Sequence, residues 1–183
     1  LTGNIARKIQ LPCTAEGMVA DHELGFFYIE EVGEAIWRIQ AEPDSSDDRF
    51  LVAGTEGLAN VVPEIEGIAL YTASDHVGFL IASSQGNNSF AIFKRKAPYP
   101  YLGSFHLSNK DNIDLTSGTD GIAVLNVSLG DQFPNGIFVA QDDVNNAPDG
   151  SVENQNFKLV RWESIMDSLG KLALTDTTNF LRK

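Results

Sequence analysis

Three acidic residues, each directly before a glycine, recur along the chain at nearly constant spacing. Glu16, Glu66 and Asp120 are separated by 50 and then 54 residues. If a structural repeat brings the three carboxylates together, each raises the pKa of the others unless a cation neutralises them. Clustered oxygen ligands suit Ca²⁺, which takes about 6–8 of them. These acid–glycine steps therefore predict a calcium site, although a single step of this kind is often only a turn.

Further oxygen-bearing side chains recur at equivalent points of each repeat. Glu64 stands two residues before Glu66, so both side chains would point to one side of an extended segment. Asp114 lies upstream of Asp120 in a polar stretch. Others follow the second apolar segment of their repeats: Glu30 and Glu31; Gln85 and Asn87; Gln141, Asp142, Asp143 and Asn145. A solvated rim of acids is the alternative for any one residue, but the repetition favours metal binding.

The segments around each acid–glycine step predict the elements that position it. Each repeat reads as a strand that starts at the step, a turn, a strand that begins with glycine, a loop and a third strand. The predicted strands are 16–20, 25–29 and 35–39, then 66–70, 78–82 and 90–94, and finally 120–124, 136–140 and 157–161. Residues 50–53 and 101–107 predict a fourth strand in the first two repeats. Residues 162–169 predict a short helix that ends at Gly170.

Four strands in about 40–50 residues is the size of one β-propeller blade. The sequence therefore predicts an all-β fold, a partial β-propeller of four-stranded antiparallel sheets, with repeats near 16–65, 66–119 and 120–162. An ordinary β-sandwich is the alternative. In a propeller the first strand of each blade borders the central channel, so the three acids would lie at its mouth. A closed ring needs about 4–8 blades, so the missing blades are expected earlier in the same polypeptide or in a second chain.

Composition narrows the possible partners. The chain has 183 residues and a formal net charge of −12, which disfavours binding to nucleic acid and to anionic membranes. Cys13 is the only cysteine, so the chain forms no internal disulfide and no zinc cluster built from thiolates. No apolar run reaches about 18 residues, so no membrane span is predicted.

At these positions the sequence closely resembles the β-propeller phytases, secreted bacterial enzymes that use calcium to remove phosphates from myo-inositol hexakisphosphate (phytate). The matching stretches cover nearly the whole chain: E-G-M-V-A-D-H-E-L-G-F-F-Y-I-E-E, E-A-I-W-R, A-E-P-D, E-I-E-G, A-S-S-Q-G-N-N-S-F-A-I, S-G-T-D-G-I-A-V-L, G-I-F-V-A-Q-D and N-Q-N-F-K-L-V-R-W-E. The resemblance implies that residues 1–183 form the C-terminal half of a single six-bladed domain. It also implies Ca²⁺ as the cofactor and a secreted or periplasmic location.

The resemblance implies roles for individual residues. Those that match positions of the active site and its calcium ions are Glu16, Glu64, Glu66, Gln85, Asp114 and Asp120. Those that match residues near a structural calcium ion are Asp142 and Asn145. The carboxylates predicted to be catalytic, by holding calcium ions that bind phosphate and position hydroxide, are Glu16, Glu64, Glu66 and Asp120. Gln85 is predicted to bind substrate.

The chain departs from the family pattern at one position of the site. Family members often read I-A-E-E-D-E-A-I-W where this chain reads I-E-E-V-G-E-A-I-W, at residues 29–37. Val32 therefore stands in place of a carboxylate, and Glu31, or else Glu30, would replace it after a local shift. Glu31 is predicted to be a metal ligand on this ground. Glu64 stands where the family commonly has Asp, which lengthens the side chain by one methylene.

These expectations define a calcium-dependent phosphomonoesterase that acts on phytate and releases inorganic phosphate. The family also holds phosphate with side chains from the N-terminal half. In this chain Arg38, Lys94 and Arg161 occupy third-strand positions away from the channel, where we expect them to be solvated. The isolated chain is therefore expected to bind calcium weakly and to hydrolyse little phytate. The alternatives are a non-catalytic module that binds calcium or docks proteins, and a lactonase-like calcium-dependent propeller hydrolase.

Overall fold

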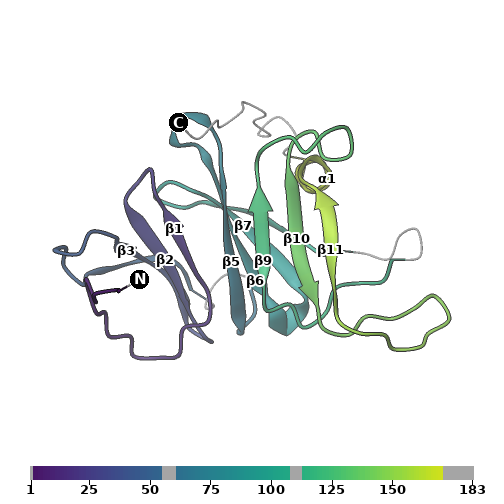
Figure 1. Ribbon diagram of the computed structural model, residues 1–183, viewed down its shortest axis with the longest axis horizontal. Coiled ribbons are helices and arrows are strands. Elements are labelled where there is room, and N and C mark those ends of the chain that lie inside the picture. Colours follow the sequence, from purple (N-terminus) through teal and green to yellow (C-terminus); the bar gives the residue numbers. More distant parts are fainter. Residues whose placement is uncertain (1, 55–60, 108–112, 171–183) are drawn as a thin grey trace.

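The computed structural model describes residues 2–54, 61–107 and 113–170. Over these ranges the chain forms three antiparallel β-sheets that follow one another in space, with β5 between β1 and β9 (Figure 1). The first sheet has the order β1-β2-β3-β4, formed by Met18–Asp21, Phe26–Glu31, Ala35–Gln40 and Arg49–Gly54. The second has the order β5-β6-β7-β8, formed by Ile65–Thr72, Gly78–Ser84, Ser89–Lys94 and Tyr101–Phe105.

The third sheet contains three strands and is followed by a helix. Its order is β9-β10-β11, formed by Ile122–Leu125, Ile137–Asp142 and Asn156–Arg161. Helix α1 (Trp162–Ser168) continues directly from β11, and Gly170 adopts a φ of 63° just beyond its end. The predicted helix is thus confirmed, and so are the fourth strands of the first two repeats, β4 and β8. Two short 3₁₀ segments, Ser74–His76 and Gln85–Asn87, belong to the second sheet's connections.

The first two strands of every sheet pair in the same register. The residue after each acid–glycine step lies opposite the same position of the second strand, in the pairs Met18–Ile29, Ile68–Ala82 and Ile122–Ala140. The sequence repeat is therefore a structural repeat, and β1, β5 and β9 are the inner strands of three equivalent units. The all-β expectation is confirmed, and the sheets are three successive blades of an open propeller. No helix among the described residues is long and apolar enough to cross a membrane.

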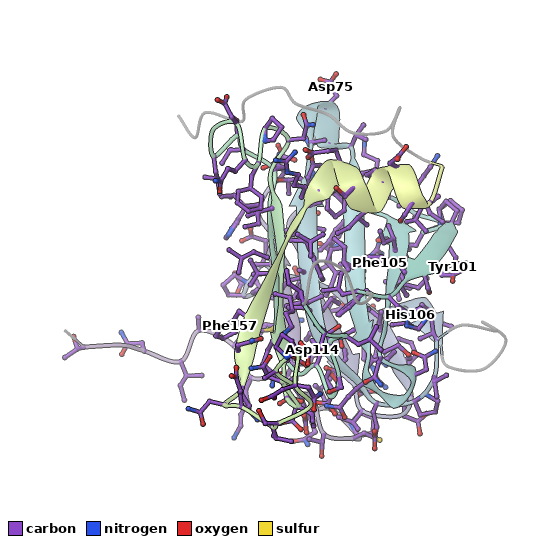
Figure 2. All side chains as sticks on the ribbon, turned by 90° about the vertical axis from the view of Figure 1, so that its right-hand side faces the viewer. Asp75, Tyr101, Phe105, His106, Asp114 and Phe157 are labelled. Carbon is purple, nitrogen blue, oxygen red and sulfur yellow. The ribbon has the colours of Figure 1, made fainter. Side chains whose placement is uncertain are left out.

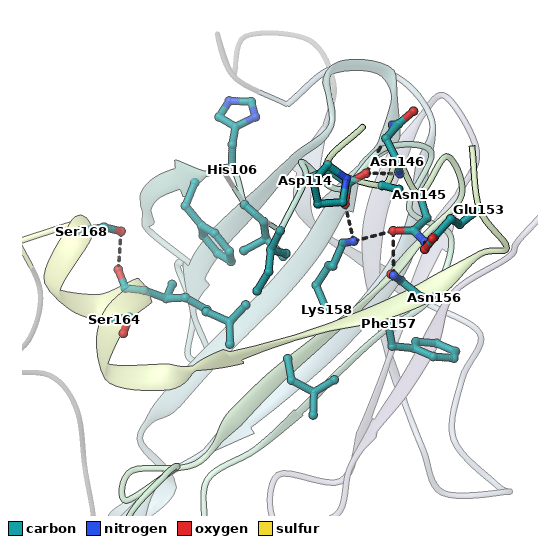
Figure 3. Close-up of a pocket in the computed structure, with 18 residues that line it drawn as sticks. His106, Asp114, Asn145, Asn146, Glu153, Asn156, Phe157, Lys158, Ser164 and Ser168 are labelled. Atoms are coloured by element: carbon teal, nitrogen blue, oxygen red, sulfur yellow. Dashed lines mark hydrogen bonds and ion pairs between the residues drawn. The ribbon is translucent and has the colours of Figure 1, made fainter. Parts of the chain in front are cut away.

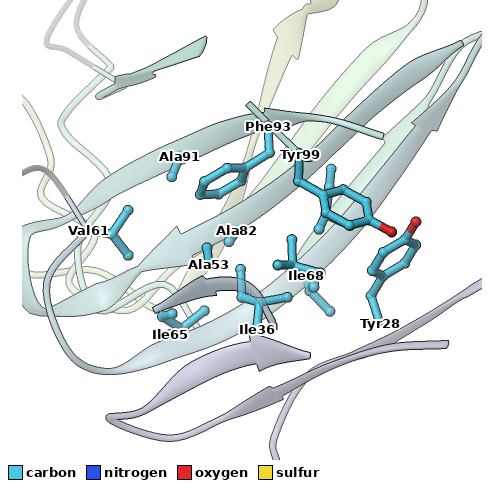
Figure 4. Close-up of a cluster of buried hydrophobic side chains, with 12 residues drawn as sticks. Tyr28, Ile36, Ala53, Val61, Ile65, Ile68, Ala82, Ala91, Phe93 and Tyr99 are labelled. Carbon is cyan, nitrogen blue, oxygen red and sulfur yellow. The ribbon is translucent and has the colours of Figure 1, made fainter. Parts of the chain in front are cut away.

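Each pair of neighbouring blades encloses its own apolar core. Between the first and second blades, Tyr28, Ile36 and Ile68 pack with Leu80 and Phe93 (Figure 4). These side chains alternate along their strands with residues of the other face, as a half-buried sheet requires. The cores hold the blades at a fixed spacing, and that spacing sets the distance between the acid–glycine steps.

Helix α1 closes the core between the second and third blades. Trp162 is fully buried and stacks on Tyr71 with ring centroids 4.2 Å apart, while Ile165 and Met166 cover the same cluster. Figure 2 views the molecule from the side of the third blade, where α1 crosses one end of β11 and Phe157 lies toward the other.

Candidate metal-binding site

Gly17 and Gly67 let the inner strands of neighbouring blades approach each other backbone to backbone. A Cβ atom at Gly17 would lie 2.6 Å from the carbonyl oxygen of Glu66, and one at Gly67 would lie even closer to that of Asp120. Any larger residue would push the strands apart, so packing of the next blade requires glycine at these steps. Because consecutive steps are in contact, Glu16, Glu66 and Asp120 form a row along the inner edge of the blades, here called the acidic row.

Glu66 stands at the centre of the acidic row. A hydrogen bond with the Glu16 carboxyl, then burial, and then the charges of Glu16, Glu30 and Asp120 raise the pKa of Glu66 to about 7. A carboxyl group with this pKa is about half protonated near neutral pH when no cation is bound. A divalent cation could take the place of that proton.

Asp120 is held from two sides by glutamine side chains. Gln85 Nε2 donates a hydrogen bond to Asp120 Oδ1 at 2.7 Å, and the backbone N–H of Asp120 donates one to Gln141 Oε1 at 3.0 Å. Gln85 begins the 3₁₀ segment after β6, so it reaches from the second blade to the third. The residue predicted to bind substrate therefore lies at the acidic row, in contact with one of its carboxylates.

Two of the predicted ligands, Glu64 and Glu31, have a backbone conformation or hydrogen-bond partners that the sequence pattern did not indicate. Glu64 has a φ of 73°, in the left-handed region, so the segment to Glu66 is not extended and strand alternation does not relate the two side chains. Glu31 is buried, and its carboxylate accepts hydrogen bonds from Trp37 Nε1 at 2.8 Å and from Arg49 Nη1 at 2.9 Å. Both of these partners belong to the outer strands of the first blade, β3 and β4.

Glu30, the second choice in the sequence, is the residue of this pair that reaches the acidic row. Its Oε2 accepts a hydrogen bond from the backbone N–H of Gly17 at 2.6 Å. Burial raises the pKa of Glu30 to about 7, although backbone hydrogen bonds from Gly17 and Glu16 oppose the shift. The sequence held no signal that separates Glu30 from Glu31, because aromatic rings lie on both faces of the strand, Tyr28 on that of Glu30 and Phe27 on that of Glu31.

A second polar cluster lies in the third blade, where three predicted ligands converge on the ammonium group of Lys158. Figure 3 shows two of them, Asp114 and Asn145, beside Lys158. Lys158 Nζ lies 2.5 Å from Asp114 Oδ1, 3.0 Å from Asp142 Oδ2 and 3.1 Å from Asn145 Oδ1. Burial lowers the pKa of Lys158, but hydrogen bonds to Asp114 and Asp142 and their charges raise it overall. The structure thus places Asp114 with the residues predicted to lie near a structural calcium ion, and a lysine that the sequence did not single out supplies their counter-charge.

A cavity of about 710 Å³ lies beside this cluster, between the end of β8, the edge strand β11 and helix α1. Its wall combines the apolar side chains of Phe105, Phe157 and Leu159 with the polar ones of His106 and Lys158. Phe157 is 65% exposed and Leu159 is 57% exposed, so the wall formed by β11 is largely open to solvent.

The acidic row offers oxygen donors of the type that calcium binds, without forming a complete ligand set among the described residues. Within residues 2–54, 61–107 and 113–170, no three His, Cys, Asp or Glu side chains converge closely enough to enclose a metal ion. The row nevertheless offers hard carboxylate oxygens, like charges crowded enough to raise the pKa of Glu66, and at Glu30 Oε1 a buried oxygen without a hydrogen-bond partner. Oxygen donors of this kind are the ones that hard divalent cations bind.

One of the three third-strand cations is not solvated as expected. Lys94 and Arg161 are exposed, but Arg38 is half-buried. Its guanidinium carbon lies 4.4 Å from the centre of the Phe26 ring and 4.6 Å from that of Phe50. Arg38 therefore packs the first blade through cation–π contacts.

Repeated antiparallel blades with carboxylates along their shared inner edge define a β-propeller protein with an acidic centre. The family model described as Phytase matches residues 1–182 of the chain. A 3-phytase of Bacillus subtilis (strain 168) is 44% identical over 172 residues, which make up 94% of this chain and 44% of that protein. The chain belongs to the phytase family, and it spans less than half of the length of this relative.

Proposed function

We propose that this chain supplies the acidic, calcium-binding part of a phosphomonoesterase that acts on phytate and releases inorganic phosphate. Membership of the phytase family supports the reaction. The observation that carries the role of the chain is the contact between consecutive acid–glycine steps, which brings Glu16 and Glu66 into a hydrogen bond and raises the pKa of Glu66 to about 7. Glu66 would release its proton when the pair binds a cation.

The residues of the acidic row have distinct parts in this proposal. Glu16 and Glu66 would hold calcium between the first and second blades, and Asp120 would extend the ligand set to the third. Bound calcium ions would neutralise phosphoryl oxygens and lower the pKa of a coordinated water. Gln85 orients Asp120 through its 2.7 Å hydrogen bond. The two glycines keep these carboxylates at the spacing of adjacent inner strands. Glu64 and Glu31 remain predicted calcium ligands, and their side chains would need to change orientation to bind calcium at the acidic row.

We also propose that further blades from the N-terminal part of a longer polypeptide complete the ring. A Cβ atom at Gly121 meets nothing within 4 Å, whereas Gly17 and Gly67 are covered by the next blade. The third blade exposes large apolar side chains that a further blade could cover, namely Leu125, Val152, Phe157 and Leu159. The relative is more than twice as long as the matched region, which leaves room for these blades.

The cluster around Lys158 is proposed to be a structural calcium site. Asp114, Asp142 and Asn145 offer the oxygen ligands that calcium prefers. Because Lys158 Nζ already contacts all three, calcium binding would require this ammonium group to share them or to move aside. Calorimetric titration should then show a second class of calcium sites besides the acidic row, and substitution of Asp142 with Asn should remove only that class.

Phosphate release from phytate tests the proposed reaction. We expect the longer polypeptide to release phosphate in the presence of calcium and to stop when a chelator is added, whereas residues 1–183 alone should release little. Glu66→Gln should lower the rate by on the order of a hundredfold, as loss of a preorganised charge does, while Glu42→Gln, at an exposed position, should not. Hydrolysis of a lactone without phosphate release would instead favour a lactonase-like enzyme, and no turnover of either substrate would favour a binding module.

The raised pKa of Glu66 predicts how calcium stabilisation depends on pH. Its pKa rises from the ordinary 4.5 to about 7, so the folded chain holds this proton more tightly than the unfolded chain does. That stabilisation is complete below pH 4.5 and is lost as the pH rises through about 7. We therefore expect calcium to raise the melting temperature more at about pH 8 than at about pH 5.5, by scanning fluorimetry with calcium or chelator. A larger calcium-induced rise in melting temperature at the lower pH would contradict this. In Glu66→Gln, the rise should be similar at the two pH values.

The location of the protein follows from the same proposal. We propose that it is secreted or periplasmic, where calcium sites of modest affinity are occupied because free calcium is plentiful. Detection of the protein in culture medium or in a periplasmic extract, and not in the cytoplasm, would test this.

A further inference from the structure

Glu30 is a buried carboxyl group that contacts the acidic row without being exposed on it. It lies on β2, its side chain is fully buried, and its Oε2 accepts a hydrogen bond from the backbone N–H of Gly17 at 2.6 Å. The backbone N–H of the first acid–glycine step at Gly17 therefore points at the Glu30 carboxyl group.

The carboxyl group of Glu30 lies inside the contact between the first two blades. A Cβ atom at Gly17 would be 3.0 Å from Glu30 Oε2 and 2.6 Å from the carbonyl oxygen of Glu66. Glu30 thus fills the space beside Gly17 at the point where β1 meets β5. A change in the position of this carboxyl group would shift the backbone that carries the Glu16 side chain.

Residues at the equivalent position of the other two blades are neutral, and they form hydrogen bonds at or directly beside the third acid–glycine step. Ser83 and Gln141 occupy the position of Glu30 in the second strands β6 and β10, because each lies five residues after the glycine that begins its segment. Gln141 Oε1 accepts a hydrogen bond from the backbone N–H of Asp120 at 3.0 Å. Ser83 Oγ donates one to the carbonyl oxygen of Thr119 at 2.7 Å, directly before the third step. In the third blade, a neutral side chain at this position thus makes the same kind of contact with its step as Glu30 makes in the first blade.

We propose that Glu30 is a positioning residue for Glu16: its carboxyl group fixes the backbone of the first acid–glycine step and so aims the Glu16 carboxylate at Glu66. This rests on the proposed calcium site of the acidic row. A neutral acceptor should serve equally well, since the amide oxygen of Gln141 accepts the corresponding hydrogen bond from the third acid–glycine step. Glu30→Gln would keep a carbonyl oxygen toward Gly17 and place an amide N–H near the carboxylates of the row.

Calcium affinity and amide exchange of three variants test this role. In calorimetric titrations, Glu30→Ala is expected to weaken calcium binding by about tenfold, the effect typical of losing a group that orients a metal ligand. The calcium affinity of Glu30→Gln is expected to stay within about twofold of that of the wild type. The same is expected of the control Glu42→Ala, at an exposed position. Hydrogen exchange of the Gly17 amide should accelerate in Glu30→Ala and stay slow in Glu30→Gln.

Several outcomes would overturn the positioning role. Equal losses of affinity in Glu30→Gln and Glu30→Ala would show that the charge of Glu30 itself holds the cation. Unchanged affinity and unchanged Gly17 exchange in Glu30→Ala would show that Glu30 only fills space. If Glu30→Ala does not fold, Glu30→Met, which keeps the volume and lacks a strong acceptor, replaces it. If the wild type binds no calcium, the proposed function fails, while exchange at Gly17 still decides whether Glu30 fixes the step.

Discussion

Substitution of Arg95 with methionine is expected to lower the free energy of unfolding by about 3–5 kcal/mol, the usual effect of breaking a buried ion pair. Arg95 follows β7 of the second blade and is fully buried. Its guanidinium group binds Asp21, at the end of β1, through both Nε and Nη2, with Nε 2.7 Å from Asp21 Oδ2. Arg95 Nη1 lies 2.7 Å from Glu23 Oε2. The pair therefore ties the second blade to the inner strand of the first.

The large effect arises because Asp21 would be left without its counter-charge. Asp21 is 1% exposed, so water cannot replace the guanidinium group. Burial alone would lower the pKa of Arg95, but its hydrogen bonds to Asp21 and Glu23 and their charges raise it overall. Methionine matches much of the volume of the arginine side chain. The loss of stability would therefore come mainly from the missing charge and hydrogen bonds, and less from a cavity.

Urea denaturation followed by circular dichroism measures this loss. Lys94→Met removes the same charge at the neighbouring exposed position and should change stability by less than about 0.5 kcal/mol. The double variant Asp21→Leu with Arg95→Met removes both charges and should recover a large part of the stability. If Arg95→Met were as stable as Lys94→Met, the interblade ion pair would not stabilise the fold.

The blades themselves could be predicted from sequence because the repeat is local. The spacing of the acid–glycine steps and the apolar segments after them depend on residues close in the chain, and the matching registers of the three sheets confirm the repeat. Contacts between blades could not be predicted in this way. Asp21 and Arg95 are 74 positions apart, and nothing in their own segments indicates a partner.

The alternation of residues along a strand does not determine which side chains meet at the site. Alternation places Glu30 and Glu31 on opposite faces, but only packing against the second blade shows that Glu30 meets the acidic row. The prediction for Glu64 assumed an extended segment, whereas its backbone is left-handed. Asp114 was assigned to the active site by its match to the family and its place upstream of Asp120, and the fold brings it to Lys158, which is 44 positions away. Each difference comes from backbone conformation or tertiary contact.

Gly67→Ala is expected to lower the free energy of unfolding by about 3 kcal/mol, at the upper end of the usual cost of overpacking. The added methyl group would overlap the carbonyl oxygen of Asp120 and lie 3.1 Å from the backbone nitrogen of Ile122. Both obstacles are backbone atoms of β9 and the step before it, so no side-chain rotation relieves the contact. The second and third blades would have to separate, and Asp120 would move away from Glu66.

Gly121→Ala is the matched control, because it makes the same change at the equivalent step with nothing within 4 Å. In residues 1–183 it should be neutral or stabilising by up to about 1 kcal/mol, since alanine restricts the unfolded chain. In a longer polypeptide whose next blade packs against the third step, the same substitution should become destabilising, as Gly67→Ala is here. Equal unfolding energies for Gly67→Ala and Gly121→Ala in the short chain would show that the steps are not in contact, and the acidic row would lose its geometric basis.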